Sequence, residues 1–264
     1  MASLSIDGFV RFLGRRVING WRYIIDIIII IYVSLKAFVT LGKGRKRVIN
    51  EILYKKLDRS IVNTSGIIGV IAFIFGAMVV TQISLMGLRM DVLGTIFDMV
   101  IIKELGPLLT MLIVTGRSAT FITTEIATMK VTQELTAFTV MGIDPKHYVM
   151  MPRVIGVTIA LVILIIFFDL CCCIGGLTMT FLLHNISTTF YIQSIISQVS
   201  FVEVYGTIIK GLISGLLLTS ISCYHGLAVK GSFVEMPSEV AKSFVSSLFF
   251  CFFANFLISY LLYL

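Results

Sequence analysis

Three charged residues stand inside apolar stretches of the sequence, where ionised side chains are rare. Lys103 and Glu104 belong to the sequence KELGP, and Lys210 belongs to IIKGL. A charge surrounded by hydrocarbon is costly, so it is retained where it meets a partner group or lines a water-filled path. We expect the Lys210 ammonium and a glutamate to meet across two helices, either as a structural ion pair or as a polar lining for an anionic headgroup.

Pro107 follows Glu104 by three residues and affects the helix that carries these charges. Proline lacks a backbone N–H and its ring clashes with the preceding turn, so the helix is expected to kink there. The kink should free a backbone carbonyl close to the Glu104 carboxylate. These features are typical of a polar transport site within an otherwise apolar helix.

A more polar segment follows, and it predicts a cytosolic helix within residues 117–145. Apolar residues recur in it at helical spacing, while acidic and basic residues fill its other faces. The apolar stripe consists of Ile122, Ile126, Met129, Leu135 and Phe138, and the polar faces carry Glu125, Lys130 and Glu134. Gly142 and Pro145 should end the helix sharply. Such a helix either lies on the lipid surface or provides a contact for a partner protein.

The composition predicts a membrane protein. Hydrophobic residues make up 58% of the 264 residues and charged residues 13%, and the mean hydropathy is +1.02. These values lie outside the range of soluble domains of this size. Because about 20 apolar residues cross a bilayer as a helix, we expect an all-α integral membrane protein with five transmembrane helices. The predicted spans are 61–88, 92–115, 154–183, 201–229 and 240–264.

Lys and Arg residues predict the orientation, because they are retained on the cytoplasmic side of the membrane. They are concentrated in the first 60 residues and in the predicted loops 117–153 and 230–242. This pattern predicts a cytosolic N-terminus and, with five spans, a C-terminus on the opposite side.

The basic N-terminal segment, residues 1–60, contains one short apolar run. Residues 23–39 hold an isoleucine-rich core that is bracketed by charges and is short for a full crossing. An interfacial helix that precedes the first span suits this pattern. A sixth full span is the alternative, and it would reverse the placement of the basic N-terminus.

The sequence gives no support for nucleic-acid binding, a metal site or catalysis. The net charge of +7 arises beside membrane segments, where anionic lipid headgroups are the simpler partner. The five cysteines lie in apolar runs without zinc-ligand spacing. We find no Walker A loop or hydrolase motif, so we expect no cofactor and no enzymatic activity in this chain.

The run from KELGP through GR, EIATMKVTQEL, GIDP and PR resembles the MlaE/YrbE permease family, the membrane subunits of ABC transporters that work with MCE-domain proteins in lipid trafficking. The resemblance defines a permease domain of residues 61–264. It implies a homodimer in the bacterial inner membrane with a periplasmic C-terminus, and phospholipid or a similar lipid as cargo. The implied partners are a cytosolic ABC ATPase that binds ATP, a periplasmic MCE-domain protein and a small STAS-domain subunit.

The resemblance also assigns roles to residues. It implies that Lys103, Glu104 and Lys210 line the lipid cavity and that the ATPase contacts a coupling helix near residues 125–142. One segment departs from the family pattern: residues 236–247 read MPSEVAKSFVSS, with Ser238 near the position of a family arginine. A contact made by that arginine is therefore not carried over to this chain.

Two other classes of protein compete with this interpretation. A proton-driven secondary transporter of an amphiphilic substrate could use Asp98, Glu104 and Asp169 as a proton relay and would need no ATPase. A membrane enzyme acting on lipid is the weaker alternative, because no nucleophile lies beside a base. The three histidines of this chain, which could serve as such a base, are scattered along the sequence at His147, His184 and His225. Only the ABC permease explains the polar helix between the second and third spans.

Overall fold

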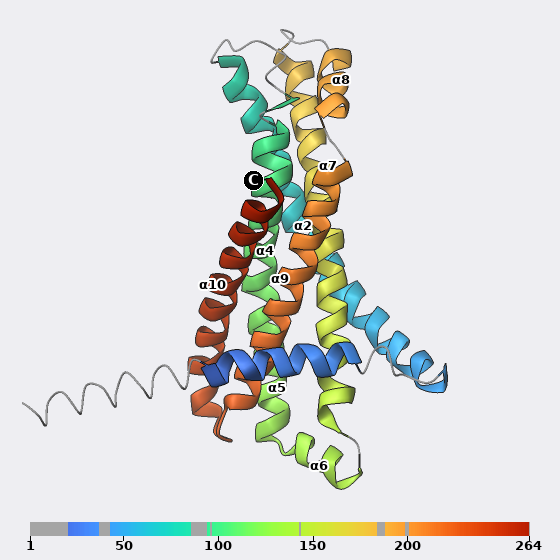
Figure 1. The fold of residues 1–264 in the computed structure, drawn as a ribbon, viewed down its shortest axis with the longest axis vertical. Helices are drawn as coiled ribbons and strands as arrows, with labels where there is room; N and C mark the ends of the chain where they lie inside the picture. The colour runs from blue at the N-terminus through green and yellow to red at the C-terminus, as the bar shows by residue number, and fades with distance from the viewer. Residues whose placement is uncertain are drawn as a thin grey trace, which may run out of the picture.

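The computed structural model describes residues 21–36, 43–85, 94–95, 97–142, 144–183, 188–198 and 201–263. These residues are almost entirely helical and include no strand, so the predicted all-α class is confirmed for the part of the chain that is described. The long helices run side by side and form an elongated bundle (Figure 1).

The long helices are α2 (Lys43–Leu85), α7 (Met151–Leu183), α9 (Phe201–Ala228) and α10 (Met236–Tyr263). The segment between α2 and α7 contains η1 (Phe97–Leu105), α4 (Gly106–Val114), η2 (Thr115–Ala119), α5 (Thr120–Val131), α6 (Glu134–Val140) and η3 (Lys146–Met150). α8 (Thr188–Gln198) precedes α9, and the short 3-10 turn η4 (Phe233–Glu235) precedes α10. The elements η1, η2 and η3 are π-helical.

Four helices are long and apolar enough to cross a membrane. They cover Thr64–Leu85, Tyr148–Leu182, Val202–Ala228 and Phe233–Leu262. They correspond to the first, third, fourth and fifth predicted spans and indicate a multi-pass membrane protein. Large apolar side chains on these helices, such as Phe73, Ile163 and Phe256, are exposed. Extensive apolar exposure of this kind marks a surface that faces lipid or another protein.

The second predicted span has a different form from the other four. Residues 97–131 are helical throughout, but π-helical and α-helical turns alternate in the order η1, α4, η2 and α5. This composite helix runs along the bundle in contact with α7 and α10 (Figure 1). Residues 86–88, 92–93, 96 and 264 of the predicted spans lie outside the described residues.

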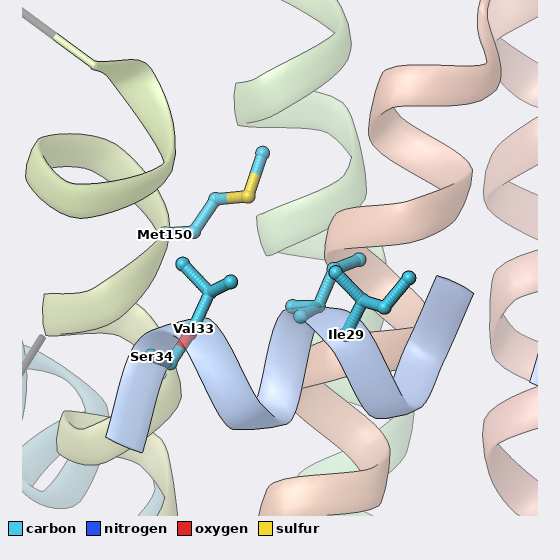
Figure 2. A pocket seen from close by; sticks show the side chains of 5 residues that line it. Ile29, Val33, Ser34 and Met150 are labelled. Atoms are coloured by element: carbon cyan, nitrogen blue, oxygen red, sulfur yellow. The ribbon is translucent and has the colours of Figure 1, made fainter. Parts of the chain in front are cut away.

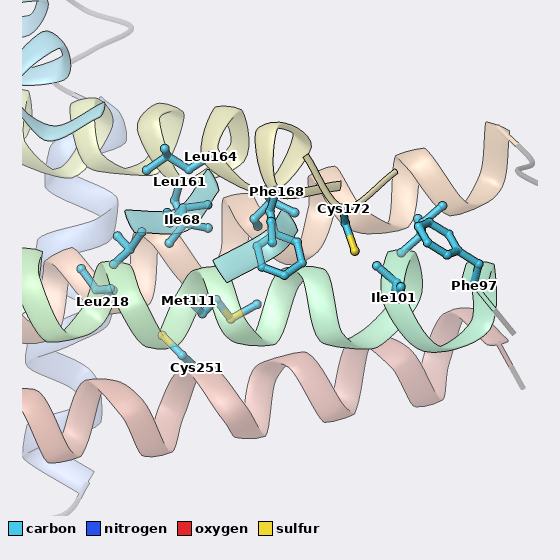
Figure 3. Packing of buried hydrophobic residues seen from close by; sticks show 14 residues of the cluster. Ile68, Phe97, Ile101, Met111, Leu161, Leu164, Phe168, Cys172, Leu218 and Cys251 are labelled. Atoms are coloured by element: carbon cyan, nitrogen blue, oxygen red, sulfur yellow. The ribbon is translucent and has the colours of Figure 1, made fainter. Parts of the chain in front are cut away.

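The main core lies where the composite helix packs on α7. Its buried apolar side chains come chiefly from η1, α4 and α7, and α2, α9 and α10 add others (Figure 3). α2 and α7 also approach closely at glycines, because a Cβ at Gly76 would collide with the backbone of Cys172 and a Cβ at Gly175 with that of Phe73. This packing fixes the composite helix, and the charges that it carries, relative to its neighbours.

The helix over residues 21–36 lies across the lower part of the bundle in Figure 1 and does not run along it as a sixth span would. Ile27, Ile30 and Ser34 are buried against the bundle. A small hollow separates this helix from Met150, as Figure 2 shows. The exposed large apolar side chains of this helix are Trp21, Ile24, Ile25, Ile28, Ile29, Tyr32 and Leu35. Residues 37–39 of the predicted helix lie outside the described residues.

Candidate functional site

Lys210 and Glu104 meet across two helices, as the sequence predicts. Lys210 Nζ in α9 lies 3.4 Å from Glu104 Oε1 in η1. The Lys210 side chain is fully buried, and its ammonium also donates a hydrogen bond to the backbone carbonyl of Lys103. A buried ammonium is tolerated only with such partners, since an unpaired one would carry a large desolvation cost.

The carbonyl that Lys210 contacts is one that Pro107 leaves without its usual donor. Pro107 has no N–H, so the α-helical bond to the carbonyl of Lys103, four residues earlier, cannot form. The carbonyl of Ile102 would accept the corresponding π-helical bond, and it accepts one from Thr207 Oγ1 of α9 at 3.5 Å. Both carbonyls therefore accept hydrogen bonds from α9 side chains. The turn before Pro107 is thus a point at which the composite helix is attached to α9.

Lys103 belongs to a second group of charges on the same helix. Its Nζ lies 2.8 Å from Asp98 Oδ2 and 3.1 Å from Glu203 Oε1 in the first turn of α9. Residues five apart lie close to one face in a π-helix, which brings Asp98 to Lys103. An α-helical interpretation puts these two residues about 140° apart, so sequence reasoning missed the pair. It also missed Glu203, because its neighbourhood FVEVYG carries no distinguishing signal.

α10 supplies a further partner, Asn255. Its Nδ2 donates to Glu104 Oε2 at 3.4 Å, and the residue is buried. Sequence reasoning missed Asn255 too, although a lone amide in the apolar run FFANFL is a usable signal for a helix contact in a membrane. We use the name polar cluster for Asp98, Lys103, Glu104, Glu203, Lys210 and Asn255.

Exposure distinguishes Glu104 from the other charged members of the polar cluster. Its side chain is 39% exposed, whereas the exposed fractions of the other four are between 0% and 19%. Glu104 therefore bridges α9 and α10 and still presents part of its carboxylate to the surroundings of the chain.

Polar contacts continue along the same helices toward α5. Thr123 Oγ1 in α5 lies 2.7 Å from Ser243 Oγ in α10, and it donates to the carbonyl of Ser222 in α9 at 3.2 Å. Ser243 belongs to the segment 236–247 that departs from the family pattern, so this segment packs on α5 without the family arginine. Ser238, near the position of that arginine, is exposed.

The helix predicted within residues 117–145 is two helices in the structure. α5 ends at Val131, Gln133 adopts a left-handed conformation with φ 63°, and α6 follows. The segment ends beyond α6 at Gly142, whose φ is 74°. Ile122 and Ile126 of the predicted stripe are buried in the bundle, whereas α6 has no buried residue. The element accessible to a partner is therefore α6, and α5 continues the composite helix.

The charged residues predicted on this segment have contacts within the chain. Glu125 receives two bonds of 2.9 Å from Arg153, the residue near the start of α7 that is only 6% exposed. Lys130 donates to the backbone carbonyl of Leu227 in α9. Glu134 accepts a bond from Thr132 Oγ1 at 3.0 Å. Two of these contacts attach the end of α5 to α7 and α9.

The helix over residues 21–36 is attached to the bundle through His225. The Tyr23 hydroxyl lies 3.3 Å from His225 Nε2, and His225 Nδ1 lies 3.0 Å from Glu239 Oε2. Lys242 adds a 2.7 Å ion pair to the same Glu239. Burial raises the pKa of the Tyr23 hydroxyl above its usual value. His225 is thus part of a structural chain of polar contacts between the N-terminal helix and α10.

Of the carboxylates considered for a proton relay, Asp98 and Glu104 belong to the polar cluster and Asp169 does not. Asp98 pairs with Lys103 and Glu104 with Lys210, while Asp169 of α7 lies against Gly106, where a Cβ would collide with its Oδ1. Of the two other histidines, the side chain of His147 and the whole of His184 lie outside the described residues.

Comparison with known proteins places this arrangement in a family. The family model described as Permease MlaE matches residues 53–261. A probable ABC transporter permease protein of Rickettsia typhi is 30% identical over 171 residues, which cover 65% of this chain and 66% of that protein. A probable ABC transporter permease protein of Synechocystis is 29% identical over 171 residues, 65% of each chain.

A relative from a plant is also similar. The protein TRIGALACTOSYLDIACYLGLYCEROL 1, chloroplastic, of Arabidopsis thaliana is 27% identical over 189 residues, which cover 70% of this chain and 53% of that protein. This chain spans from about half to just under two thirds of the length of these three relatives. The family match includes the composite helix, the polar cluster and α6. The chain therefore belongs to the MlaE permease family and is a multi-pass membrane permease.

Proposed function

We propose that this chain is the transmembrane subunit of an ABC transporter that moves phospholipid or a similar lipid between the inner membrane and a periplasmic MCE-domain protein. The observation that carries the proposal is the polar cluster, in which Glu104 joins two helices of an apolar bundle and remains partly exposed. A few charges beside apolar surface suit an amphiphile, whose headgroup meets the charges and whose chains meet the apolar side chains. The lipid named in the Arabidopsis relative supports lipid as the cargo.

The permease domain, residues 61–264, crosses the membrane five times in this proposal, and the composite helix is the second crossing. The helix over residues 21–36 lies at the cytosolic interface, where its exposed apolar side chains contact lipid. α6 and this helix lie toward the same end of the bundle (Figure 1), which supports a cytosolic N-terminus and a periplasmic C-terminus.

Two copies of the chain form the transporter's membrane part and enclose the lipid path. Lys103, Glu104 and Lys210 of each copy form one side of this path: the exposed part of the Glu104 carboxylate is the surface that a headgroup meets, and the buried Lys210 supports it from within the bundle. A homodimer supplies two such surfaces on either side of one path.

Energy comes from a separate cytosolic ATPase that binds ATP, with a small STAS-domain subunit as a further partner. The ATPase contacts α6 and its end at Gly142 and Pro145, where Val140 and Met141 expose 83% and 63% of their surfaces. Movement of α6 reaches α7 through the Glu125–Arg153 pair and α9 through Lys130. The lipid path narrows when these helices shift.

A proton-coupled secondary transporter of an amphiphilic substrate is the second candidate. The observation that favours it is Asp169, whose Oδ1 is buried and has no hydrogen-bond partner among the described residues. Carboxyl groups inside membrane helices are the groups that form proton relays in pumps and transporters.

Purification of the tagged chain from its own cells in mild detergent, followed by mass spectrometry, tests the proposal. Recovery of an ATPase, an MCE-domain protein and phospholipid supports it. The purified assembly is then placed in proteoliposomes, and lipid transfer is measured with ATP and with an imposed proton gradient. Transfer that follows the gradient and ignores ATP would replace the ABC permease by the secondary transporter.

A further inference from the structure

The polar cluster is unequal in charge. Within the described residues it contains three carboxylates, Asp98, Glu104 and Glu203, and two ammonium groups, Lys103 and Lys210. Among these five groups, acidic side chains outnumber basic ones by one. Charged groups beside a low-dielectric region act strongly on a nearby headgroup, so this excess bears on which headgroups the site accepts.

Both ammonium groups are directed at acceptors of the protein. Lys103 lies between Asp98 and Glu203 at 2.8 and 3.1 Å. Lys210 donates to the backbone carbonyl of Lys103 and has no exposed side-chain surface. An anionic headgroup would have to compete with two carboxylates for the first lysine and could not reach the second.

Glu104, unlike the two lysines, presents a charged group that a ligand can reach. Its side chain is 39% exposed, and its contacts to Lys210 and Asn255 are both 3.4 Å long. Charge-assisted hydrogen bonds between an ammonium and a carboxylate are usually about 2.7–2.9 Å long, and a carboxylate has roughly four acceptor positions. Glu104 therefore keeps acceptor capacity for an N–H donor from a ligand, and a cationic donor suits a cluster in which acidic side chains outnumber basic ones.

We propose that Glu104 selects lipids whose headgroup carries a primary ammonium, such as a phosphoethanolamine headgroup, over anionic headgroups without one. The proposal rests on the proposed lipid transport. The ammonium donates to the exposed part of the Glu104 carboxylate, while Asp98 and Glu203 hold Lys103 away from the lipid phosphate. Glu203 is thus a second determinant of headgroup preference, because it keeps Lys103 engaged. This preference is the reverse of the anionic-headgroup lining considered from the sequence.

The test measures which lipid the protein retains. The full-length permease, in its complex, is exchanged in detergent with equal amounts of phosphatidylethanolamine and phosphatidylglycerol of the same acyl chains, and bound lipid is quantified by mass spectrometry. Both lipids carry a phosphodiester, so their ratio compares an ammonium-bearing headgroup with an anionic one that ends in a glycerol diol. We expect phosphatidylethanolamine to be enriched, and Glu104→Gln to lower the ratio about two- to fivefold, the effect of losing one partly exposed ion pair.

A further variant keeps the test decisive if Glu104→Gln fails to fold. Glu203→Gln leaves Lys103 with Asp98 and should also shift retention toward phosphatidylglycerol. The matched control is Glu235→Gln, an equal charge change at an exposed residue between α9 and α10, which should leave the ratio unchanged.

The outcomes separate this inference from the proposed function. Retention and ATP-driven transfer of both lipids without preference, or a Glu104→Gln ratio equal to that of the control, would overturn the headgroup selection and leave lipid transport in place. Retention of neither lipid above a detergent blank would overturn both. Enrichment of phosphatidylglycerol in the unaltered protein would show that the lysines face the headgroup, against the proposal.

Discussion

The ammonium of Lys210 donates to the backbone carbonyl of Lys103, the acceptor that Pro107 leaves without an α-helical donor. One residue of α9 therefore completes the hydrogen bonding of a break in the composite helix. The same ammonium lies 3.4 Å from Glu104 Oε1. The break in the helix, the buried lysine and the exposed glutamate form one unit, and each part of it can be tested by substitution.

Lys210→Met removes the ammonium and leaves the Lys103 carbonyl without this donor. We expect the permease to be destabilised by about 1–3 kcal/mol, the usual cost of leaving a buried polar group unsatisfied. Thermal unfolding in detergent measures the change. Combining Lys210→Met with Glu104→Gln should recover part of the loss, because the carboxylate then no longer lacks its counter-ion. A double variant as unstable as the sum of the single variants would show that the two side chains are not coupled.

Pro107→Ala introduces an N–H four residues after Lys103. This N–H can bond to the carbonyl that Lys210 contacts, so the composite helix should become more regular and its attachment to α9 weaker. We expect the melting temperature to stay the same or rise while ATP-driven lipid transfer falls. Pro237→Ala is the matched control, because Pro237 lies in the first turn of α10, where helices tolerate proline, and is not a member of the polar cluster. Equal transfer by both variants would contradict a role for the break.

Apolar run lengths and isolated charges were sufficient to predict much of this structure. The runs predicted five spans, and four of them are helices long and apolar enough to cross a membrane in the described part of the chain. The rarity of charge within the runs singled out Lys210 and Glu104. Such signals are local, because a bilayer imposes the same length and polarity on each helix separately.

The other features depend on packing that the sequence does not display. The π-helical form of η1 brings Asp98 to Lys103, and it accompanies the contacts that α9 makes with the carbonyls near Pro107. The break at Gln133 uses a positive φ in a residue type that carries no such signal. Asn255 became a site residue only once α10 lay beside Glu104. The contacts that α9 and α10 make with the composite helix depend on neighbours far away in the sequence.

Glu125→Gln tests the connection between α5 and α7. It replaces the ionised partner of Arg153, a guanidinium that is only 6% exposed. The Glu125 side chain is itself 30% exposed, so we expect a loss of about 1–3 kcal/mol rather than the 3–5 kcal/mol of fully buried pairs. The lipid-stimulated rate of ATP hydrolysis of the assembled transporter should also fall, even at temperatures at which the variant is still fully folded.

Glu134→Gln provides the stability control for this experiment. Glu134 lies on exposed α6 and accepts a hydrogen bond from the nearby Thr132. The melting temperature of the Glu134→Gln variant should therefore match that of the unaltered chain. If Glu125→Gln melts normally and keeps its lipid-stimulated hydrolysis, the Glu125–Arg153 pair does not transmit movement.

Tyr23→Phe removes the hydroxyl that lies 3.3 Å from His225 and should cost about 0.5–1.5 kcal/mol at neutral pH. Burial raises the pKa of Tyr23 above the usual value of 10.0, so in alkali the folded chain keeps a proton that the unfolded chain loses. This contribution to stability is therefore complete below pH 10 and is lost as the pH rises through the higher, folded-state pKa. Melting curves of both proteins between about pH 8 and 11.5 should converge at the alkaline end. If the difference in melting temperature between the two proteins stayed constant across that pH range, the protonated Tyr23 hydroxyl would not be what anchors the N-terminal helix.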